Sequence, residues 1–241
     1  MDIKKIFKVI NKVSKNNNIP VYIVGGFVRD FLLGREQKKD VDFVVEGSGL
    51  EFAKKFDEAI KKEGSLVEFP DFDTARYVVK VESKKFPPKA DQPRAEKINE
   101  NKEDTVVIEF AGARSEKYDA QSRKPKVEMT SLKEDLARRD FTVNAMAVPV
   151  VVFAGLRSVS LVSIKKNLID YFGGQKDLEN KILKTPLTPD TTFSDDPLRM
   201  LRALRFASQL DFAIDPSTLE AIYKNRERIK IISAERVQEE L

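Results

Sequence analysis

The sequence contains neither cysteine nor histidine among its 241 residues. Without cysteine the chain has no disulfide bonds, no thiolate metal sites and no cysteine nucleophile, although this absence says nothing about the compartment. Without histidine it has no Ser-His-Asp triad, no histidine-ligated zinc and no metal phosphohydrolase centre built on His-Asp pairs. The enzyme chemistry that remains for such a chain is that of hard metal ions held by carboxylates.

Long apolar runs are also missing. No stretch approaches the ~18 unbroken apolar residues of a membrane span, and the amphipathic N-terminal segment has no signal-peptide core behind it. We therefore expect a folded cytoplasmic protein without a membrane partner, with one large or two smaller domains built from the 41% of residues that are hydrophobic. The net charge of +4 permits an RNA partner without arguing strongly for one, and the oligomeric state stays open.

A strand, a tight turn, a short helix and a second strand are predicted between residues 21 and 45. The β-branched run Val21–Val24 ends in Gly25 and Gly26, where the backbone can approach a ligand closely and the helix start offers N–H groups to a phosphate. The second strand opens on Asp40 and Asp42, which point to one side because residues two apart share a face. Two carboxylates beside a triphosphate are a magnesium site. Taken separately, a glycine pair is most often only a turn, and Asp-x-Asp is most often a solvated strand edge.

Two later stretches hold further polar candidates. The predicted strand Thr105–Phe110 carries Glu109 inside an apolar run, where a glutamate facing water on an edge strand is an equally good interpretation. The arginine pair Arg138 and Arg139 offers guanidinium groups suited to phosphate oxygens, and the nearby Asp140 and Asn144 offer a carboxylate and an amide suited to sugar hydroxyls. On chemistry alone, a surface salt-bridge cluster is the more common explanation of this second group.

A helix is predicted after residue 194, with Ser194 as its cap and Asp196 near its positive end. Pro197 is tolerated in its first turn. Three arginines recur at every third position, and the simplest interpretation is a solvated face on which Asp196 pairs with Arg199. The apolar residues that we expect on the buried side are Leu198, Leu201, Leu204 and Phe206, and the arginines are Arg199, Arg202 and Arg205.

The other elements follow from periodicity, caps and breakers. The segment from Ser83 to Asp104 is rich in proline and charge and has almost no apolar content, so it is predicted to be a mobile loop or a hairpin extension. Helices are predicted at residues 3–13, 50–60, 216–230 and 233–241. A further helix is predicted to begin with the capping box at 131–134, and a small helix is predicted to start at 177–179. Strands are predicted at residues 66–69, 75–81, 105–110, 148–152, 159–164 and 168–171.

Four motifs in order resemble those of bacterial tRNA nucleotidyltransferases (CCA-adding enzymes) and poly(A) polymerases, within the DNA polymerase beta superfamily of nucleotidyltransferases. The resemblance runs from about Val21 to Leu241, although the connection at 83–104 is longer than is usual for the family. The motifs are GGFVRDFLLGR with DVD (residues 25–35 and 40–42), RRDFTVNAM (138–146), DDPLRMLRALRF (195–206) and the ER and EL pairs of 235–241.

The resemblance implies an α/β (α+β) head with a small mixed sheet at residues 1–150, followed by a linker and a mainly α-helical neck at 151–241. It implies transfer of a nucleoside monophosphate from ATP or CTP to the 3′ end of tRNA or another RNA. Enzymes of this family continue through further RNA-binding helices, so we expect this sequence to be truncated at its C-terminus.

The resemblance also implies a role for each candidate residue. Asp40 and Asp42 would hold two Mg²⁺ ions, helped by Glu109, which takes by position the place of a third carboxylate that is aspartate in many relatives. The residues implied for the triphosphate and its metal are Gly25, Gly26, Arg29 and Asp30. Those implied for ribose and phosphate are Arg139, Asp140 and Asn144. The third motif belongs to the neck that holds the incoming base, and its polar residues are Asp196, Arg199, Arg202 and Arg205.

Two kinds of alternative stay open at this point. A poly(A) polymerase, or an enzyme that adds only CC or only A, shares every motif above. In a different class, the chain could be a non-catalytic RNA-binding relic, since fold alone does not guarantee function. A relic would be expected to have lost some of the motif residues, whereas Asp40, Asp42, Asp196 and Arg199 are all present.

Overall fold

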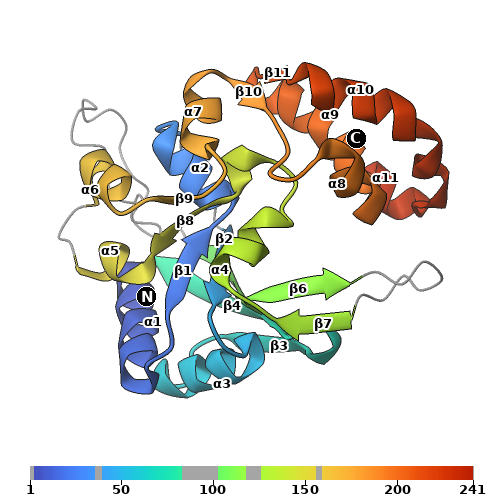
Figure 1. Ribbon diagram of the computed structural model, residues 1–241. Helices are drawn as coiled ribbons and strands as arrows, with labels where there is room; N and C mark the ends of the chain where they lie inside the picture. The colour runs from blue at the N-terminus through green and yellow to red at the C-terminus, as the bar shows by residue number, and fades with distance from the viewer. Residues whose placement is uncertain (1–2, 36–39, 83–102, 118–125, 156–158, 241) are drawn as a thin grey trace. The chain divides into compact units, whose positions relative to one another are not determined.

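The computed structural model of the protein describes residues 3–35, 40–82, 103–117, 126–155 and 159–240 (Figure 1). Contacts within the chain divide it into two compact units. The first unit comprises Met1–Ser115, Val127–Leu132 and Ala147–Ile169, and the second comprises Glu116–Lys126, Lys133–Met146 and Asp170–Leu241. Among the described helices, none has the length and apolar character needed to cross a lipid bilayer.

The first unit is built on a seven-stranded sheet with the strand order β3-β4-β5-β2-β1-β8-β9. β2 and β5 run parallel, whereas β1 pairs antiparallel with β2 and β8, and β4 pairs antiparallel with β3 and β5. The predicted mixed α/β fold is confirmed. The strands are β1 (Val21–Val24), β2 (Asp40–Val45), β3 (Ser65–Phe69), β4 (Thr74–Glu82), β5 (Glu103–Gly112), β8 (Met146–Pro149) and β9 (Ile169–Asp170).

The two faces of this sheet differ because apolar and polar residues alternate along its strands. In β2, Phe43 is buried while Asp40 and Asp42 are exposed. The ring of Phe43 packs against Phe110 of β5 with centroids 5.4 Å apart, and Phe110 in turn contacts Phe52 of a helix at 5.3 Å. One face therefore carries an aromatic core, and the other face is left for polar side chains.

Helices pack on the apolar face. α1 buries residues at helical spacing, as predicted, and its Phe7 ring lies 5.4 Å from that of Phe153. α1 contacts both α3 and α5 (Figure 1). The helices of this unit are α1 (Ile3–Asn17), α2 (Gly26–Leu32), α3 (Gly49–Ala59), η1 (Pro70–Phe72), α5 (Val150–Gly155) and α6 (Leu161–Lys166).

The start of α3 has Ser48 as its N-cap, whose hydroxyl accepts the Glu51 N–H at 3.2 Å, and it is also held by a residue far away in the sequence. The Asp73 carboxylate accepts hydrogen bonds from the Ser48 hydroxyl at 2.6 Å and from the Gly49 and Leu50 N–H groups at 3.0 and 3.3 Å. Asp73 itself has a positive φ of 43°, which aspartate tolerates better than most residues. This carboxylate therefore ties the loop before β4 to the first turn of α3.

We expect the change Asp73→Ala to lower the free energy of unfolding by about 2–3 kcal/mol, because it removes the carboxylate that accepts from Ser48, Gly49 and Leu50 and places alanine in the left-handed region. Asp73→Asn should cost less, since asparagine keeps one acceptor oxygen and tolerates this backbone conformation. Urea denaturation measures both variants, with Glu58→Ala on the exposed side of α3 as the control. Equal effects of Asp73→Ala and Glu58→Ala would contradict the capping role.

Two predicted strands are helices in the structure. Residues 150–152 of the predicted strand 148–152 begin α5, and most of the predicted strand 159–164 lies in α6. Short runs of β-branched residues do not distinguish a strand from a buried helix, so the predictions were wrong here. A helix signal was present for α6, because the Ser160 hydroxyl accepts the Ser163 N–H at its N-terminus.

The second unit is mainly helical. Its helices α8 and α10 contact each other, and α9 contacts α8 and α11. Two short strands, β10 and β11, pair parallel. The elements are α4 (Leu132–Ala137), whose first residue still belongs to the first unit, η2 (Thr142–Asn144), α7 (Gly174–Glu179), β10 (Ile182–Leu183), α8 (Pro189–Asp195), α9 (Leu198–Leu210), β11 (Ala213–Ile214), α10 (Pro216–Asn225), η3 (Arg226–Ile231) and α11 (Ala234–Glu240).

The boundary between α8 and α9 corrects the prediction for Ser194. This serine lies in the last turn of α8 and does not cap the following helix. Asp196 has an extended conformation between the two helices, and its carboxylate accepts the Leu198 N–H at 3.1 Å. The prediction that Leu204 is on the buried side was also wrong, since Leu204 is 52% exposed and Met200 and Ala203 are buried instead.

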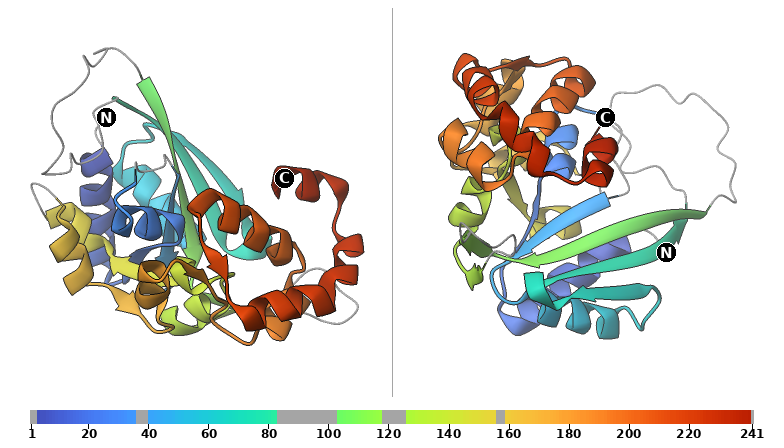
Figure 2. Two further views of the ribbon diagram at one scale, coloured as in Figure 1. Left: turned by 90° about the horizontal axis from the view of Figure 1, so that it is seen from above. Right: turned by 90° about the vertical axis from the view of Figure 1, so that its right-hand side faces the viewer.

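The predicted loop or hairpin extension at 83–104 lies almost wholly outside the described residues. Its last two residues, Glu103 and Asp104, belong to β5. β4 and β5 pair along their whole length up to Glu82 opposite Glu103, and Figure 2 shows these two long strands side by side. A separate two-stranded sheet is formed by β6 (Arg114–Lys117) and β7 (Lys126–Met129).

Candidate functional site

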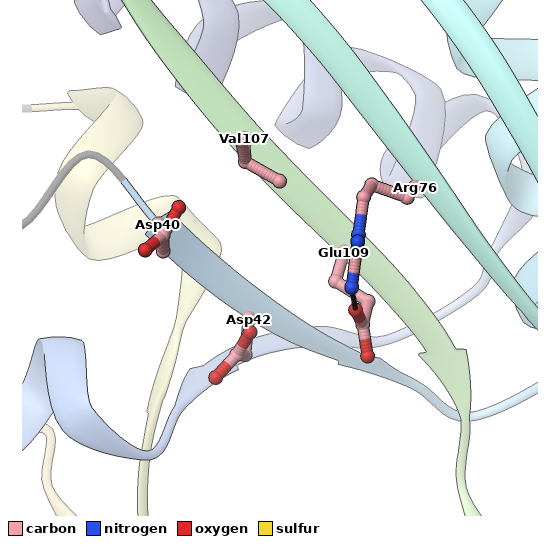
Figure 3. Close-up of a pocket in the computed structure, with 5 residues that line it drawn as sticks. All are labelled: Asp40, Asp42, Arg76, Val107 and Glu109. Atoms are coloured by element: carbon pink, nitrogen blue, oxygen red, sulfur yellow. Dashed lines mark hydrogen bonds and ion pairs between the residues drawn. The ribbon is translucent and has the colours of Figure 1, made fainter. Parts of the chain in front are cut away.

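Three carboxylates line one pocket on the polar face of the sheet in the first unit. The pocket has a volume of about 280 Å³ and is lined by Asp40, Asp42, Arg76, Val107 and Glu109 (Figure 3). Strand register explains this grouping, because Asp42 lies opposite Glu109 in the β2–β5 pair and Glu109 lies opposite Arg76 in the β4–β5 pair. Residues opposite each other on neighbouring strands share a face. We call this site the carboxylate pocket.

Arg76 is a member of this pocket that the sequence did not indicate. Its Nη2 atom lies 3.3 Å from Oε2 of Glu109, and the two side chains are 50% and 37% exposed (Figure 3). The arginine also lies over the ring of Phe69, 5.9 Å from its centroid. The alternation of buried Ala75 and Tyr77 shows which face Arg76 occupies, but only the strand order places it beside Glu109.

The donor set of the pocket fits a hard divalent cation, because carboxylate oxygens are the ligands that Mg²⁺ prefers. Asp40 and Asp42 are exposed and extend from one face of β2 (Figure 3). Across the part of the chain that the structure describes, however, no three acidic side chains are close enough together to hold one metal ion. Glu109 instead contacts Arg76 through its Oε2 atom.

The glycine turn has the geometry that the sequence predicts. Gly25 has φ 71° and ψ −144°, a conformation that residues with a Cβ atom rarely adopt, and it precedes the first residue of α2. Arg29 and Asp30 are buried, with exposed fractions of 2% and 4%, and Arg29 Nε donates to Asp30 Oδ1 at 2.8 Å. A Cβ atom at Gly26 would lie 3.4 Å from Arg29 Nη2, so this ion pair packs behind the turn and does not line the carboxylate pocket.

The second unit contains a pocket rich in arginine. Its volume is about 280 Å³, and we call it the arginine pocket. Five arginines against two aspartates favour an anionic ligand. The lining residues are Arg138, Arg139, Asp140, Asp196, Leu198, Arg199, Arg202 and Arg236.

Both carboxylate oxygens of Asp140 are occupied by groups of the protein. Oδ1 accepts the Phe141 N–H at 2.8 Å and the Asn144 side-chain amide at 3.0 Å, while Oδ2 accepts Nε and Nη2 of Arg202 at 3.0 and 2.7 Å. Burial alone would raise the pKa of Asp140, but the Arg202 guanidinium and these hydrogen bonds lower it below the ordinary value. Asp140 therefore fixes the positions of Arg202 and Asn144.

The pH dependence of stability tests this arrangement. Because the folded pKa of Asp140 is lowered, its stabilising effect is fully present above the unfolded value of ~3.9 and is lost as the pH falls toward the folded pKa. We expect Asp140→Asn to lower the free energy of unfolding by about 2–3 kcal/mol at neutral pH, and this difference from wild type to shrink below about pH 4. Denaturation between pH 3 and 7 measures it, and Asp211→Asn, at an exposed ion pair, is the control.

Asp196 and Arg199 both line the arginine pocket, but they do not form the ion pair that the simplest interpretation predicts. Asp196 Oδ2 lies 3.5 Å from Nη2 of Arg236, and Arg199 Nη1 donates to the Thr192 carbonyl at 3.4 Å. The backbone link that does exist is the Arg199 N–H donating to the Asp196 carbonyl at 3.1 Å. Two polar side chains of opposite charge thus face one pocket without being paired to each other.

Arginines next to these residues are held by acidic partners. Arg202 and Arg205 both pair with Glu240 of α11, with the shorter distance being 2.6 Å from Arg205 Nε. Arg138 and Arg139 both pair with Asp135, whose burial opposes ionisation but whose pKa these two arginines lower. Of the residues predicted for this region, Arg139, Asp140, Asp196, Arg199 and Arg202 line the arginine pocket, whereas Asn144 and Arg205 support it.

Two participants, Arg236 and Glu240, were not predicted for this site. Both belong to the final motif, and in the structure Arg236 lines the arginine pocket while Glu240 pairs with Arg205. Their roles depend on the contact between α11 and α9, which no local pattern predicts.

The mixed sheet with its carboxylate pocket and the helices that follow match the head and helical region of nucleotidyltransferases. Within that class, the chain belongs to the family described as the poly A polymerase head domain, which matches residues 21–184. A second family description, "Probable RNA and SrmB- binding site of polymerase A", matches residues 211–241.

Relatives are found among both curated proteins and solved structures. The chain is 46% identical to an A-adding tRNA nucleotidyltransferase of Aquifex aeolicus over 82% of its own length and 19% of the relative. It is 34% identical to tRNA nucleotidyltransferase cca2 of Schizosaccharomyces pombe, over 96% of this chain and 44% of that protein. A tRNA nucleotidyltransferase solved with a primer tRNA and an incoming ATP analogue matches with a TM-score of 0.66 and 35% identity, over 96% of this chain and 54% of that one. The chain thus spans less than half the length of these two curated relatives.

Proposed function

We propose that this protein is a cytoplasmic tRNA nucleotidyltransferase that transfers CMP and AMP from CTP and ATP to the 3′ end of tRNA, with release of pyrophosphate. In this proposal residues 1–150 form the catalytic head, and residues 151–241 form a linker and helical neck. The observation that carries the proposal is the register that lines up Asp42 with Glu109, with Asp40 in the same pocket. The solved relative with primer tRNA and an ATP analogue supports the choice of substrates.

The carboxylate pocket is assigned to the phosphate chemistry. Asp40 and Asp42, helped by Glu109, would hold two magnesium ions. Magnesium bound there would lower the pKa of the attacking hydroxyl and neutralise charge on the reacting phosphate. Gly25 and Gly26 offer their close backbone approach to the triphosphate, and the buried Arg29–Asp30 pair keeps that turn in place from behind.

The arginine pocket is assigned to the nucleoside. Asp196 offers an acceptor and Arg199 offers donors, and the two side chains are not paired with each other. Arg139 contributes to ribose and phosphate binding, since its guanidinium group lines the arginine pocket. Asp140 acts here by holding Arg202, and Asn144 donates to the other oxygen of the Asp140 carboxylate.

A second candidate is an enzyme that adds only the terminal A. The relative from Aquifex aeolicus, at 46% identity, has that name. An A-adding enzyme would use the same carboxylate and arginine pockets, so the two candidates differ in products and not in the chemistry described above.

The deciding experiment is the sequence of the 3′ ends made from two tRNA substrates, one lacking CCA and one ending in CC. Each is incubated with magnesium and with CTP, ATP, both or all four nucleotides. A CCA-adding enzyme extends both substrates, an A-adding enzyme extends only the CC end, and a poly(A) polymerase adds many adenylates. Absence of both addition and magnesium-dependent binding of ATP or CTP would favour the non-catalytic alternative.

A further inference from the structure

Glu109 lies between two possible partners on the same face of the sheet. β5 is flanked by β2 and β4, so Glu109 is opposite Asp42 on one side and opposite Arg76 on the other. Its carboxylate pairs with Arg76 at 3.3 Å. Within the described residues, the three carboxylates of the pocket are not grouped as a metal site.

We propose that Arg76 is a positioning residue that holds Glu109 away from Asp40 and Asp42 until a divalent cation competes for it. The inference rests on the proposed function, because it assumes that the carboxylate pocket binds the cation. With Glu109 turned toward the aspartates, the Arg76 guanidinium stays on the pocket wall and can take an oxygen of an anionic phosphate group. Arg76 thus exchanges one anionic partner for another as the site is filled.

The energetics permit this exchange. The Arg76 and Glu109 side chains are 50% and 37% exposed, and an ion pair at such exposure is weak. A divalent cation beside Asp40 and Asp42 offers Glu109 twice the charge of the guanidinium, whereas without a cation the three carboxylates would repel one another. The ring of Phe69 under Arg76 keeps the guanidinium near the pocket in either arrangement.

The test is a titration of the full chain with Mn²⁺ in the absence of nucleotide, followed by calorimetry. We expect Arg76→Gln to bind Mn²⁺ about two- to fivefold more tightly than wild type, the range that an exposed ion pair produces. Arg76→Lys, which keeps the charge, should stay near the wild-type affinity. Lys80→Gln removes a positive charge from the same strand and serves as the control, for which we expect less than half of that effect.

A double-mutant cycle separates positioning from a general effect of charge. If Arg76 acts through Glu109, the change Arg76→Gln has little effect on Mn²⁺ affinity in a Glu109→Gln background. An effect of undiminished size in that background, or no effect in either, overturns the positioning role. A different result would contradict the proposed function itself, namely that wild type shows no Mn²⁺ binding that depends on Asp40 and Asp42. That result would also overturn the inference.

A second measurement examines the exchange of partners. With the cation present, Arg76→Gln should bind the non-hydrolysable ATP analogue about two- to fivefold more weakly than wild type, although it binds the cation more tightly. A residue with a merely structural role would not move these two affinities in opposite directions. Movement of both in the same direction would contradict the exchange.

Discussion

Replacement of both Asp40 and Asp42 with alanine is expected to lower nucleotide addition by ~10³-fold or more, because it removes the proposed ligands of the catalytic metal ions. The fold should survive, since both side chains are exposed on the polar face of β2 while their neighbours Val41 and Phe43 form the core. Single-turnover addition of one nucleotide to tRNA measures the rate. Circular dichroism and the melting temperature of the same variants report on the fold.

Glu109→Ala should have a milder effect than either aspartate change, because Glu109 is paired with Arg76 and, in our proposal, joins the aspartates only when a cation binds. Glu58→Ala, at an exposed acidic residue of α3 outside the carboxylate pocket, is the matched control and should keep wild-type activity. Near-normal magnesium-dependent activity in the Asp40→Ala, Asp42→Ala double variant would contradict the assignment of this pocket to catalysis.

The second large effect is expected in the choice of base. Cytosine and adenine each present an exocyclic amino donor next to a ring-nitrogen acceptor, whereas uracil and guanine present a carbonyl next to a ring N–H. An acceptor on Asp196 and donors on Arg199, both facing the arginine pocket, match the first pattern and oppose the second. A mismatched base would leave charged groups without partners, at a cost of ~1–3 kcal/mol for each unmade hydrogen bond.

We therefore expect Asp196→Ala and Arg199→Ala each to reduce the preference for CTP and ATP over UTP and GTP by about tenfold or more, in line with the loss of one such hydrogen bond. Incorporation of all four nucleotides by each variant measures the preference. Asp196→Asn is a useful companion, because it keeps an oxygen for the Leu198 N–H and so separates the cap of α9 from base selection. If the preference for C and A survives both alanine changes, Asp196 and Arg199 have only a structural role.

The elements that sequence reasoning predicted correctly are those with long or strongly marked patterns. α1 shows helical spacing over several turns, and β2 has polar residues at alternate positions at its start. α5 and α6 were missed because Val150–Val152 and Leu161–Ile164 are too short for their period to be defined, and β-branched residues then favour a strand. Contacts of α5 with α1 decide the conformation, and no local pattern records them.

The site shows the same division between local and distant information. Asp40 and Asp42 belong to one strand, so their common face could be predicted from spacing alone. Arg76 could not, because its place beside Glu109 depends on which strands are neighbours. Likewise, α9 begins at Leu198, later than predicted. The ion-pair partner of Asp196 is Arg236 of α11 and not Arg199.

The parallel pairing of β2 with β5 has a consequence for how the protein reaches its active form. β1 and β2 lie within residues 21–45, and β3, β4 and β5 lie within residues 65–112, so each group pairs mostly with near neighbours in the sequence. The β2–β5 pair joins the two groups across more than fifty residues and is the slower contact to form. Asp42 and Glu109 lie opposite each other in this strand pair. A chain in which only the local groups have folded would contain every carboxylate and yet have no pocket, so cation binding would report the formation of the β2–β5 pair.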